Sequence, residues 1–189
     1  MIENAFVSTF HLWPDESEVR DGRLFVQGHD VSTLADAYGT PLYVIDAKTI
    51  ENQIAAYKKE LASYPVDAKI YYASKALLNT AIAQLMLKNG VGIDVVSLNE
   101  LLIAKRAGFD LADVHFHGNG TPIEELKSAV SLGVGCILLD NLDQVDQLLS
   151  FNHPATVMLR IAPDVIAGGH EKIQTGAARP SGFFHAPLQ

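Results

Sequence analysis

A lysine at the end of a short apolar run is the residue of this chain best suited to covalent chemistry. Lys75 closes the run from Lys69 to Ala76, which is of strand length and predicts a buried strand of an α/β protein. Such sheets place their chemistry at the carboxyl ends of strands, and burial there favours the neutral amine that attacks a carbonyl to form a Schiff base. The alternative is a lysine whose stem packs while its ammonium reaches solvent, and position alone favours that alternative.

Four further apolar runs end in or near an ionisable residue. Reading each to its carboxyl end gives Asp94, His117, Asp140 and Arg160. Because the strand ends of a barrel converge on one face, these residues and Lys75 indicate a site for an anionic ligand that contains a carbonyl group. An arginine at such a position binds phosphate or carboxylate through two parallel hydrogen bonds. Asp140 directly precedes a predicted helix and is interpreted as an ordinary helix cap.

The segment His115-Phe116-His117 raises the possibility of a metal site. Residues two apart on a strand face the same side, so both imidazoles could ligate one ion. No third ligand is evident nearby, and short histidine motifs are weak signals, so no metal is predicted.

The elements that must position these residues form a repeat. Apolar strand candidates centre on Ile70, Ile93, Val114, Ile137 and Met158, and helices are predicted over residues 77–88, 98–107, 122–132 and 142–150. Pro122 fits the first turn of the third helix, with Thr121 as its cap. Alternating strands and single helices with short loops predict a parallel sheet built of βα units.

A doubly wound sheet and a (β/α)8 barrel both satisfy this pattern. The even repeat contains no long connection that would mark a reversal of strand order, which favours the barrel. The segment Gly90-Val91-Gly92 precedes its strand, so the glycine motif of dinucleotide-binding folds is absent. We therefore expect an α/β fold in the form of a partial (β/α)8 barrel of the TIM type.

The first forty-odd residues do not follow this repeat of strands and helices. Short strands are predicted over 6–12, 24–27 and 42–45, a short helix from Val31 to Gly39, and a longer helix from Ala47 to about Ser63. Asp46 is a suitable cap for the longer helix. We expect residues 1–46 to be a short β segment, part of a β domain, and residues 47–189 to contain the first five βα units of the barrel.

Composition limits the classes of protein and partner. With 48% hydrophobic and 19% charged residues among 189, the chain is of the globular class. A net charge of -8 without a basic block argues against nucleic-acid and membrane partners. The single cysteine, Cys136, fits a reducing compartment, and no secretory signal or membrane-spanning stretch is evident, so a cytoplasmic protein is predicted.

Several segments, in order and spacing, resemble one known family. They are Gly39-Thr40-Pro41-Leu42-Tyr43-Val44, Tyr72-Ala73-Ser74-Lys75-Ala76, Gly92-Ile93-Asp94-Val95-Val96-Ser97 with Glu100, His117-Gly118-Asn119, Leu159-Arg160-Ile161-Ala162-Pro163 and residues 170–176. The chain resembles the amino-terminal part of diaminopimelate decarboxylase, in the barrel-type, alanine racemase-like group of pyridoxal-phosphate enzymes that also contains ornithine and arginine decarboxylases.

The resemblance implies a role for each matching residue. Lys75 would be the catalytic lysine that forms the Schiff base with pyridoxal phosphate. The residues that would bind the cofactor are Lys75, Asp94, His117 and Arg160, with Glu100 and Asn119 in support. The implied reaction is the decarboxylation of meso-diaminopimelate, a small amino acid, to L-lysine, with the cofactor as electron sink. The implied assembly of the full-length enzyme is a homodimer.

The chain also departs from the family. The family enzyme is more than twice as long, and after Gly176 its usual Ser-Lys-Phe-Gly is replaced by Ala177-Ala178-Arg179-Pro180. We interpret the chain as a truncated or frameshifted gene product. Two other hypotheses stay open: a catalytically inactive fragment that is inert or associates with a full-length relative, and a pyridoxal-phosphate-dependent racemase or carrier with a similar barrel.

Overall fold

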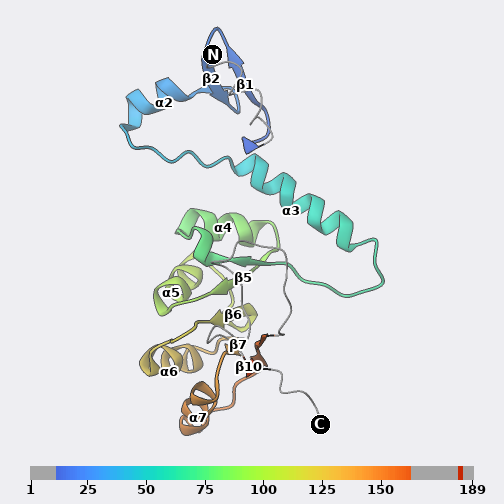
Figure 1. Cartoon of the computed structure of the whole chain (residues 1–189), viewed down its shortest axis with the longest axis vertical. Helices are drawn as coiled ribbons and strands as arrows, with labels where there is room; N and C mark the ends of the chain where they lie inside the picture. The colour runs from blue at the N-terminus through green and yellow to red at the C-terminus, as the bar shows by residue number, and fades with distance from the viewer. Residues whose placement is uncertain (1–11, 163–182, 185–189) are drawn as a thin grey trace. The chain divides into compact units, whose positions relative to one another are not determined.

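The chain folds as two units, which divide between Ala68 and Lys69 (Figure 1). The computed structural model describes residues 12–162 and 183–184. None of the helices in these residues has both the length and the hydropathy of a membrane-spanning segment.

The described part of the first unit, from Leu12 to Ala68, contains a small antiparallel sheet and two α-helices. Its elements are β1 (Ser17–Arg20), β2 (Arg23–Val26), β3 (His29–Asp30), α2 (Val31–Tyr38) and α3 (Ala47–Leu61), with the strands in the order β1-β2-β3. The Asp30 carboxylate accepts a hydrogen bond from the Ser32 N–H and the Asp46 carboxylate one from the Lys48 N–H, each at 2.8 Å. Both predicted helices are therefore confirmed, and Asp46 is the predicted cap of the longer one.

Two strands predicted for this unit, over 6–12 and 42–45, are not confirmed. The predicted strand over 6–12 lies outside the described residues except for Leu12, which is not in a strand. The strand predicted over 42–45 is wrong: no described strand pairs with this segment, and its four side chains are all exposed, Tyr43 by 92%. A stretch of apolar residues without a neighbouring strand has no ladder of hydrogen bonds to join.

The second unit contains a five-stranded parallel sheet whose strands follow chain order. The strands are β4 (Tyr71–Ala73), β5 (Gly92–Val95), β6 (Val114–His117), β7 (Cys136–Leu139) and β8 (Val157–Leu159). The helices between them are α4 (Thr80–Lys88), α5 (Leu98–Ala107), α6 (Ile123–Ser131) and α7 (Leu142–Ser150). Short 3-10 turns are η2 (Ser74–Ala76) and η3 (Leu111–Asp113), and β9 (Ile161–Ala162) pairs in parallel with β10 (Phe183–Phe184). This order without reversal confirms the prediction of a partial barrel.

Successive side chains of a strand point to opposite faces of the sheet, and the two faces differ in burial and polarity. One face, which Figure 1 shows lined by α4–α7, is buried: Ile93 and Val114 are fully covered, and Phe116 and Ile137 are 1% exposed. The residues between them face the other way and include half-buried polar side chains, among them Asp94, His115 and His117. The apolar core therefore lies under the helices, while the opposite face carries polar side chains that could form a site.

A glycine of β5 lets two neighbouring rings meet across that face. A Cβ atom on Gly92 would lie 2.6 Å from the Tyr71 ring. Tyr71, on β4, stacks on His115, on β6, with ring centroids 3.8 Å apart and an interplanar angle of 14°. The missing side chain of Gly92 thus leaves room for a contact that skips one strand.

Candidate functional site

The predicted site residues all lie in the second unit, at or just beyond the carboxyl ends of its strands. Asp94 and His117 are in β5 and β6, Lys75 and Asn119 follow β4 and β6, Arg160 follows β8, and Glu100 is in the first turn of α5. The register of five parallel strands brings these ends to one edge of the sheet.

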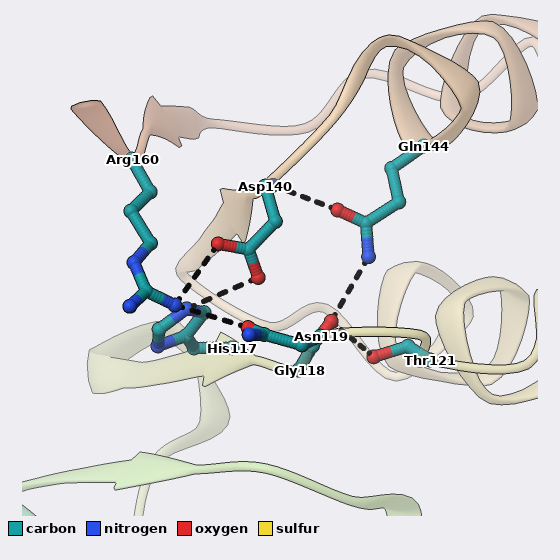
Figure 2. A network of polar contacts seen from close by, with 7 residues as sticks. All are labelled: His117, Gly118, Asn119, Thr121, Asp140, Gln144 and Arg160. Carbon is teal, nitrogen blue, oxygen red and sulfur yellow. Dashed lines mark hydrogen bonds and ion pairs between the residues drawn. The ribbon is translucent and has the colours of Figure 1, made fainter. Parts of the chain in front are cut away.

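Arg160 is the centre of a polar network formed by three strand ends (Figure 2). Its Nη1 donates to Asp140 Oδ1 at 3.2 Å and to Asn119 Oδ1 at 3.1 Å. His117 Nε2 lies 3.4 Å from Asp140 Oδ2, an ion-pair distance for a protonated imidazole, although the geometry is not that of a hydrogen bond. The Asp140 side chain is only 3% exposed and that of Arg160 27%, so a buried carboxylate orients a partly exposed guanidinium.

The interpretation of Asp140 as a helix cap is wrong. The residue after it, Asn141, caps α7 by accepting a hydrogen bond from the Gln144 N–H at 2.9 Å. Aspartate and asparagine cap helices equally well, so the adjacent pair left the choice ambiguous in the sequence. With Asn141 in the cap position, the Asp140 carboxylate is available to His117 and Arg160.

Gln144 links the ends of β6 and β7, and sequence reasoning missed it. Its Oε1 accepts from the Asp140 N–H at 2.8 Å and its Nε2 donates to the Gly118 carbonyl at 2.9 Å (Figure 2). A glutamine three residues after a capping asparagine is the spacing of a capping box, which is the signal that could have found it.

The Gly118 carbonyl also explains why the predicted cap of the helix α6 is wrong. Thr121 does not cap α6: its hydroxyl donates to Gly118 O at 2.9 Å, and Pro122 takes the cap position without a side-chain hydrogen bond. Two side chains, one from the loop before α6 and one from the first turn of α7, therefore hold the carbonyl that directly follows His117.

Asp94 lies within electrostatic reach of the lysine and both histidines. Burial raises the pKa of its carboxyl, the positive charges of His117, His115 and Lys75 oppose that rise, and Glu100 adds to it. Burial also lowers the pKa of His115. Ionisation of the half-buried Asp94 carboxyl therefore costs free energy, and the nearby cations offset part of that cost.

Lys75 lies in the turn η2 and not in the strand. The strand β4 ends at Ala73, and the Lys75 side chain is exposed, so the structure agrees with the alternative of an ammonium that reaches solvent and not with a buried amine. The tight turn places Ser74 inside instead, at 1% exposure. The Ser74 hydroxyl donates to Glu100 Oε2, which also accepts the Val96 N–H at 2.8 Å. Glu100 therefore anchors the turn that presents Lys75.

The set of groups at these strand ends suits an anionic carbonyl compound. It combines a primary amine, a guanidinium, imidazoles and carboxylates. Among the described residues, three buried site atoms have no hydrogen-bond partner, namely Asp94 Oδ1, His117 Nε2 and Asp140 Oδ2. Buried polar atoms are normally satisfied, so Asp94 Oδ1 is available to a polar ligand, whereas His117 Nε2 and Asp140 Oδ2 lie at ion-pair distance from each other.

Comparison with known proteins gives a consistent result. Residues 47–180 match the family model described as pyridoxal-dependent decarboxylase, pyridoxal binding domain. Diaminopimelate decarboxylase of Bacillus subtilis is 40% identical over 159 residues, which cover 82% of this chain and 36% of that protein. Diaminopimelate decarboxylase of Methanocaldococcus jannaschii is 35% identical over 173 residues, covering 86% and 39%.

The fold is also shared with solved structures. The crystal structure of diaminopimelate decarboxylase from M. jannaschii superposes with a TM-score of 0.75 at 32% identity, covering 90% of this chain and 42% of that one. The same values hold for its co-complex with L-lysine. The chain thus spans little more than a third of the length of the curated relatives it matches.

Proposed function

This chain belongs to the pyridoxal-dependent decarboxylase family, and on that premise we propose that it supplies the cofactor-binding part of a diaminopimelate decarboxylase. The observation that carries the proposal is the gathering of Lys75, Asp94, His117 and Arg160 at one edge of a single parallel sheet. Residues 47–189 would be the barrel units that hold the cofactor, and residues 1–46 part of a β domain.

The residues present fit pyridoxal phosphate, which has an aldehyde, a pyridine ring and a phosphate. Lys75 is the amine for the aldehyde, and its exposure leaves it accessible. Arg160 offers positive charge to an anionic group, held in place by Asp140 and Asn119. Asp94, whose buried Oδ1 lacks a hydrogen-bond partner in the described part of the chain, and His117 provide polar contacts beside the ring. When bound, the cofactor supplies an electron sink for the electrons released as a carboxylate leaves.

The proposed substrate is meso-diaminopimelate and the product L-lysine. Relatives named diaminopimelate decarboxylase at 40% and 35% identity support this choice, as does the structure of one of them in co-complex with L-lysine. We place the protein in the cytoplasm, as a homodimer when the family's full length is present. The net charge of -8 argues against nucleic acids and membranes as partners.

Absorbance tests cofactor binding by the purified chain. Pyridoxal phosphate should produce a band at about 420 nm, typical of its Schiff bases, that is absent in Lys75→Ala. The control is Lys105→Ala, which removes an exposed lysine of α5 and should keep the band. Borohydride reduction followed by mass spectrometry should locate the adduct on Lys75. A chain without a Lys75-dependent band would contradict the proposal.

Carbon dioxide release tests the reaction. We expect release from meso-diaminopimelate and none from ornithine or arginine. Release from ornithine or arginine alone would overturn the proposed substrate. A chain that forms the band and releases no carbon dioxide would bind the cofactor without catalysis, the outcome expected of an inactive fragment.

A further inference from the structure

Three successive helices of the second unit use the same position to bind a backbone N–H just beyond the carboxyl edge of the sheet. The third residue of α5, α6 and α7 is Glu100, Glu125 and Gln144, respectively. Each side chain accepts a hydrogen bond from a backbone N–H in a loop or helix start: Glu100 from Val96, Glu125 from Leu98 and Gln144 from Asp140, all at 2.8 Å. This repeated contact fixes the carboxyl edge of the sheet, where the site lies.

The residue type at each position matches the groups that it meets. Glu100 faces two donors, the Val96 N–H and the Ser74 hydroxyl, and a carboxylate accepts both. Gln144 faces one donor and one acceptor, the Asp140 N–H and the Gly118 carbonyl, so only a group that both accepts and donates satisfies the pair. Gln144 is 5% exposed, which leaves little access for water to substitute for a lost bond.

We propose that Gln144 is a positioning residue for the anion-binding arginine. Its amide holds the carbonyl after His117 at a fixed distance from the backbone of Asp140 (Figure 2). Asp140 and Asn119, on either side of that link, are the two partners of Arg160. The identity of the ligand as pyridoxal phosphate rests on the proposed function, whereas the coupling of Gln144 to Arg160 stands on these contacts alone.

The acid isostere provides a discriminating variant. In Gln144→Glu, an ionised carboxylate would face the Gly118 carbonyl without a proton to donate, beside the buried Asp140. A protonated carboxyl would restore both bonds, since it accepts through one oxygen and donates through the other. The defect of this variant should therefore disappear at low pH and grow as pH rises. Gln144→Met, which is similar in size but makes neither bond, should have a defect that does not vary with pH.

The test uses the full chain and isothermal calorimetry with pyridoxal phosphate from about pH 5.5 to about pH 8.5. Relative to the unsubstituted chain at each pH, Gln144→Met should bind about 10-fold more weakly throughout. Gln144→Glu should match the unsubstituted chain at the lowest pH and bind about 10-fold more weakly at the highest. The control Gln53→Glu, on the exposed side of α3, should bind normally at every pH.

A second readout needs no cofactor. In nitrogen-15 spectra of the cofactor-free chain, the Arg160 Nε–H and Asp140 N–H signals should move with pH in Gln144→Glu and stay fixed in Gln53→Glu. A merely structural role would lower the stability of both Gln144 variants without a pH-dependent change at Arg160. A Gln144→Glu defect that is constant with pH, or unmoved Arg160 signals, would overturn the proposal. If the unsubstituted chain fails to bind pyridoxal phosphate, the proposed function fails, and the spectra still decide the role of Gln144.

Discussion

Asp140 and Arg160 directly follow successive strands of the parallel sheet, β7 and β8, and form an ion pair, with 3.2 Å between Oδ1 and Nη1. The Arg160 N–H also donates to the Leu139 carbonyl at 3.0 Å, so backbone and side chain both tie the end of β8 to β7. Because the carboxylate is buried and the guanidinium partly exposed, Asp140 determines where the positive charge of Arg160 lies.

Replacing Asp140 with alanine should therefore cost both stability and ligand affinity. Arg160 would lose its buried partner, which we expect to lower the free energy of unfolding by about 1–3 kcal/mol. Urea denaturation measures this loss, and calorimetry should show weaker binding of pyridoxal phosphate. Asp146→Ala removes an exposed carboxylate from α7 and is the matched control. Equal unfolding midpoints for the two variants would contradict a structural role for the pair.

Asp94→Asn should stabilise the chain at neutral pH. The pKa of Asp94 is raised in the folded state, chiefly by burial, so folding favours the protonated carboxyl. Its ionised form therefore lowers the free energy of unfolding as pH rises above about 3.9, the ordinary value for aspartate in an unfolded chain. The neutral amide removes that penalty, by a fraction of a kcal/mol since the side chain is only half-buried.

The measurement for Asp94→Asn is urea denaturation at several pH values. The gain should be present at neutral pH, shrink as pH falls toward about 3.9, and vanish only well below that value, where the carboxyl is protonated in both states. A variant that is less stable than the unsubstituted chain at neutral pH would show that the carboxylate is a net stabilising group. Improved stability with loss of cofactor binding would mark Asp94 as a residue kept for the ligand and not for the fold.

For His115 we expect the opposite dependence of stability on pH. Burial lowers its pKa in the folded state, so the unfolded chain takes up a proton first as pH falls below about 6.5. Stability should therefore decline from that value downward, and His115→Phe, which keeps a ring against Tyr71, should remove this part of the decline. His153→Gln, at an exposed position, is the control. An unchanged slope between pH ~6.5 and ~5 in His115→Phe would contradict the assignment.

Much of the second unit follows from periodicity alone. Apolar runs about 20 residues apart predicted all five strands, and the helices over 98–107 and 142–150 match α5 and α7 in their bounds. Prediction was less successful where two groups compete for one local role. Asp140 and Asn141 can both cap a helix, and Thr121 prefers the Gly118 carbonyl to the cap of α6. Long-range partners decide such cases, and a linear pattern does not contain them.

Lys75 illustrates the same limit for the site. The apolar run leading to it predicted a strand that continues to the lysine, but the chain turns at Ser74, whose hydroxyl donates a hydrogen bond to Glu100, 26 residues away. The residue types of the site were predictable, since lysine, arginine and histidine at strand ends are unusual. The exposure of the lysine and the network around Asp140 depend on contacts between units of the repeat, which emerge only when the sheet is formed.

Two glycines should respond differently to alanine. A Cβ on Gly92 would meet the Tyr71 ring at 2.6 Å, and the ring can move at the cost of its contact with His115. A Cβ on Gly135 would meet the backbone carbonyl of Ala112 at 1.8 Å, and that backbone cannot yield. We expect Gly92→Ala to lower the free energy of unfolding by about 1–3 kcal/mol and Gly135→Ala by more. Thermal denaturation ranks the two, and the reverse order would refute the packing argument.

Glu100→Ala should disturb the turn that presents Lys75. The substitution leaves the Val96 N–H and the buried Ser74 hydroxyl without their acceptor, which we expect to cost about 1–3 kcal/mol of unfolding free energy. Glu124→Ala removes the same charge from an exposed position in the first turn of α6 and should cost only a few tenths. Because Ser74 is adjacent to Lys75, borohydride trapping of pyridoxal phosphate on Lys75 should be slower in Glu100→Ala alone. Equal trapping rates in the two variants would show that the lysine does not depend on this anchor.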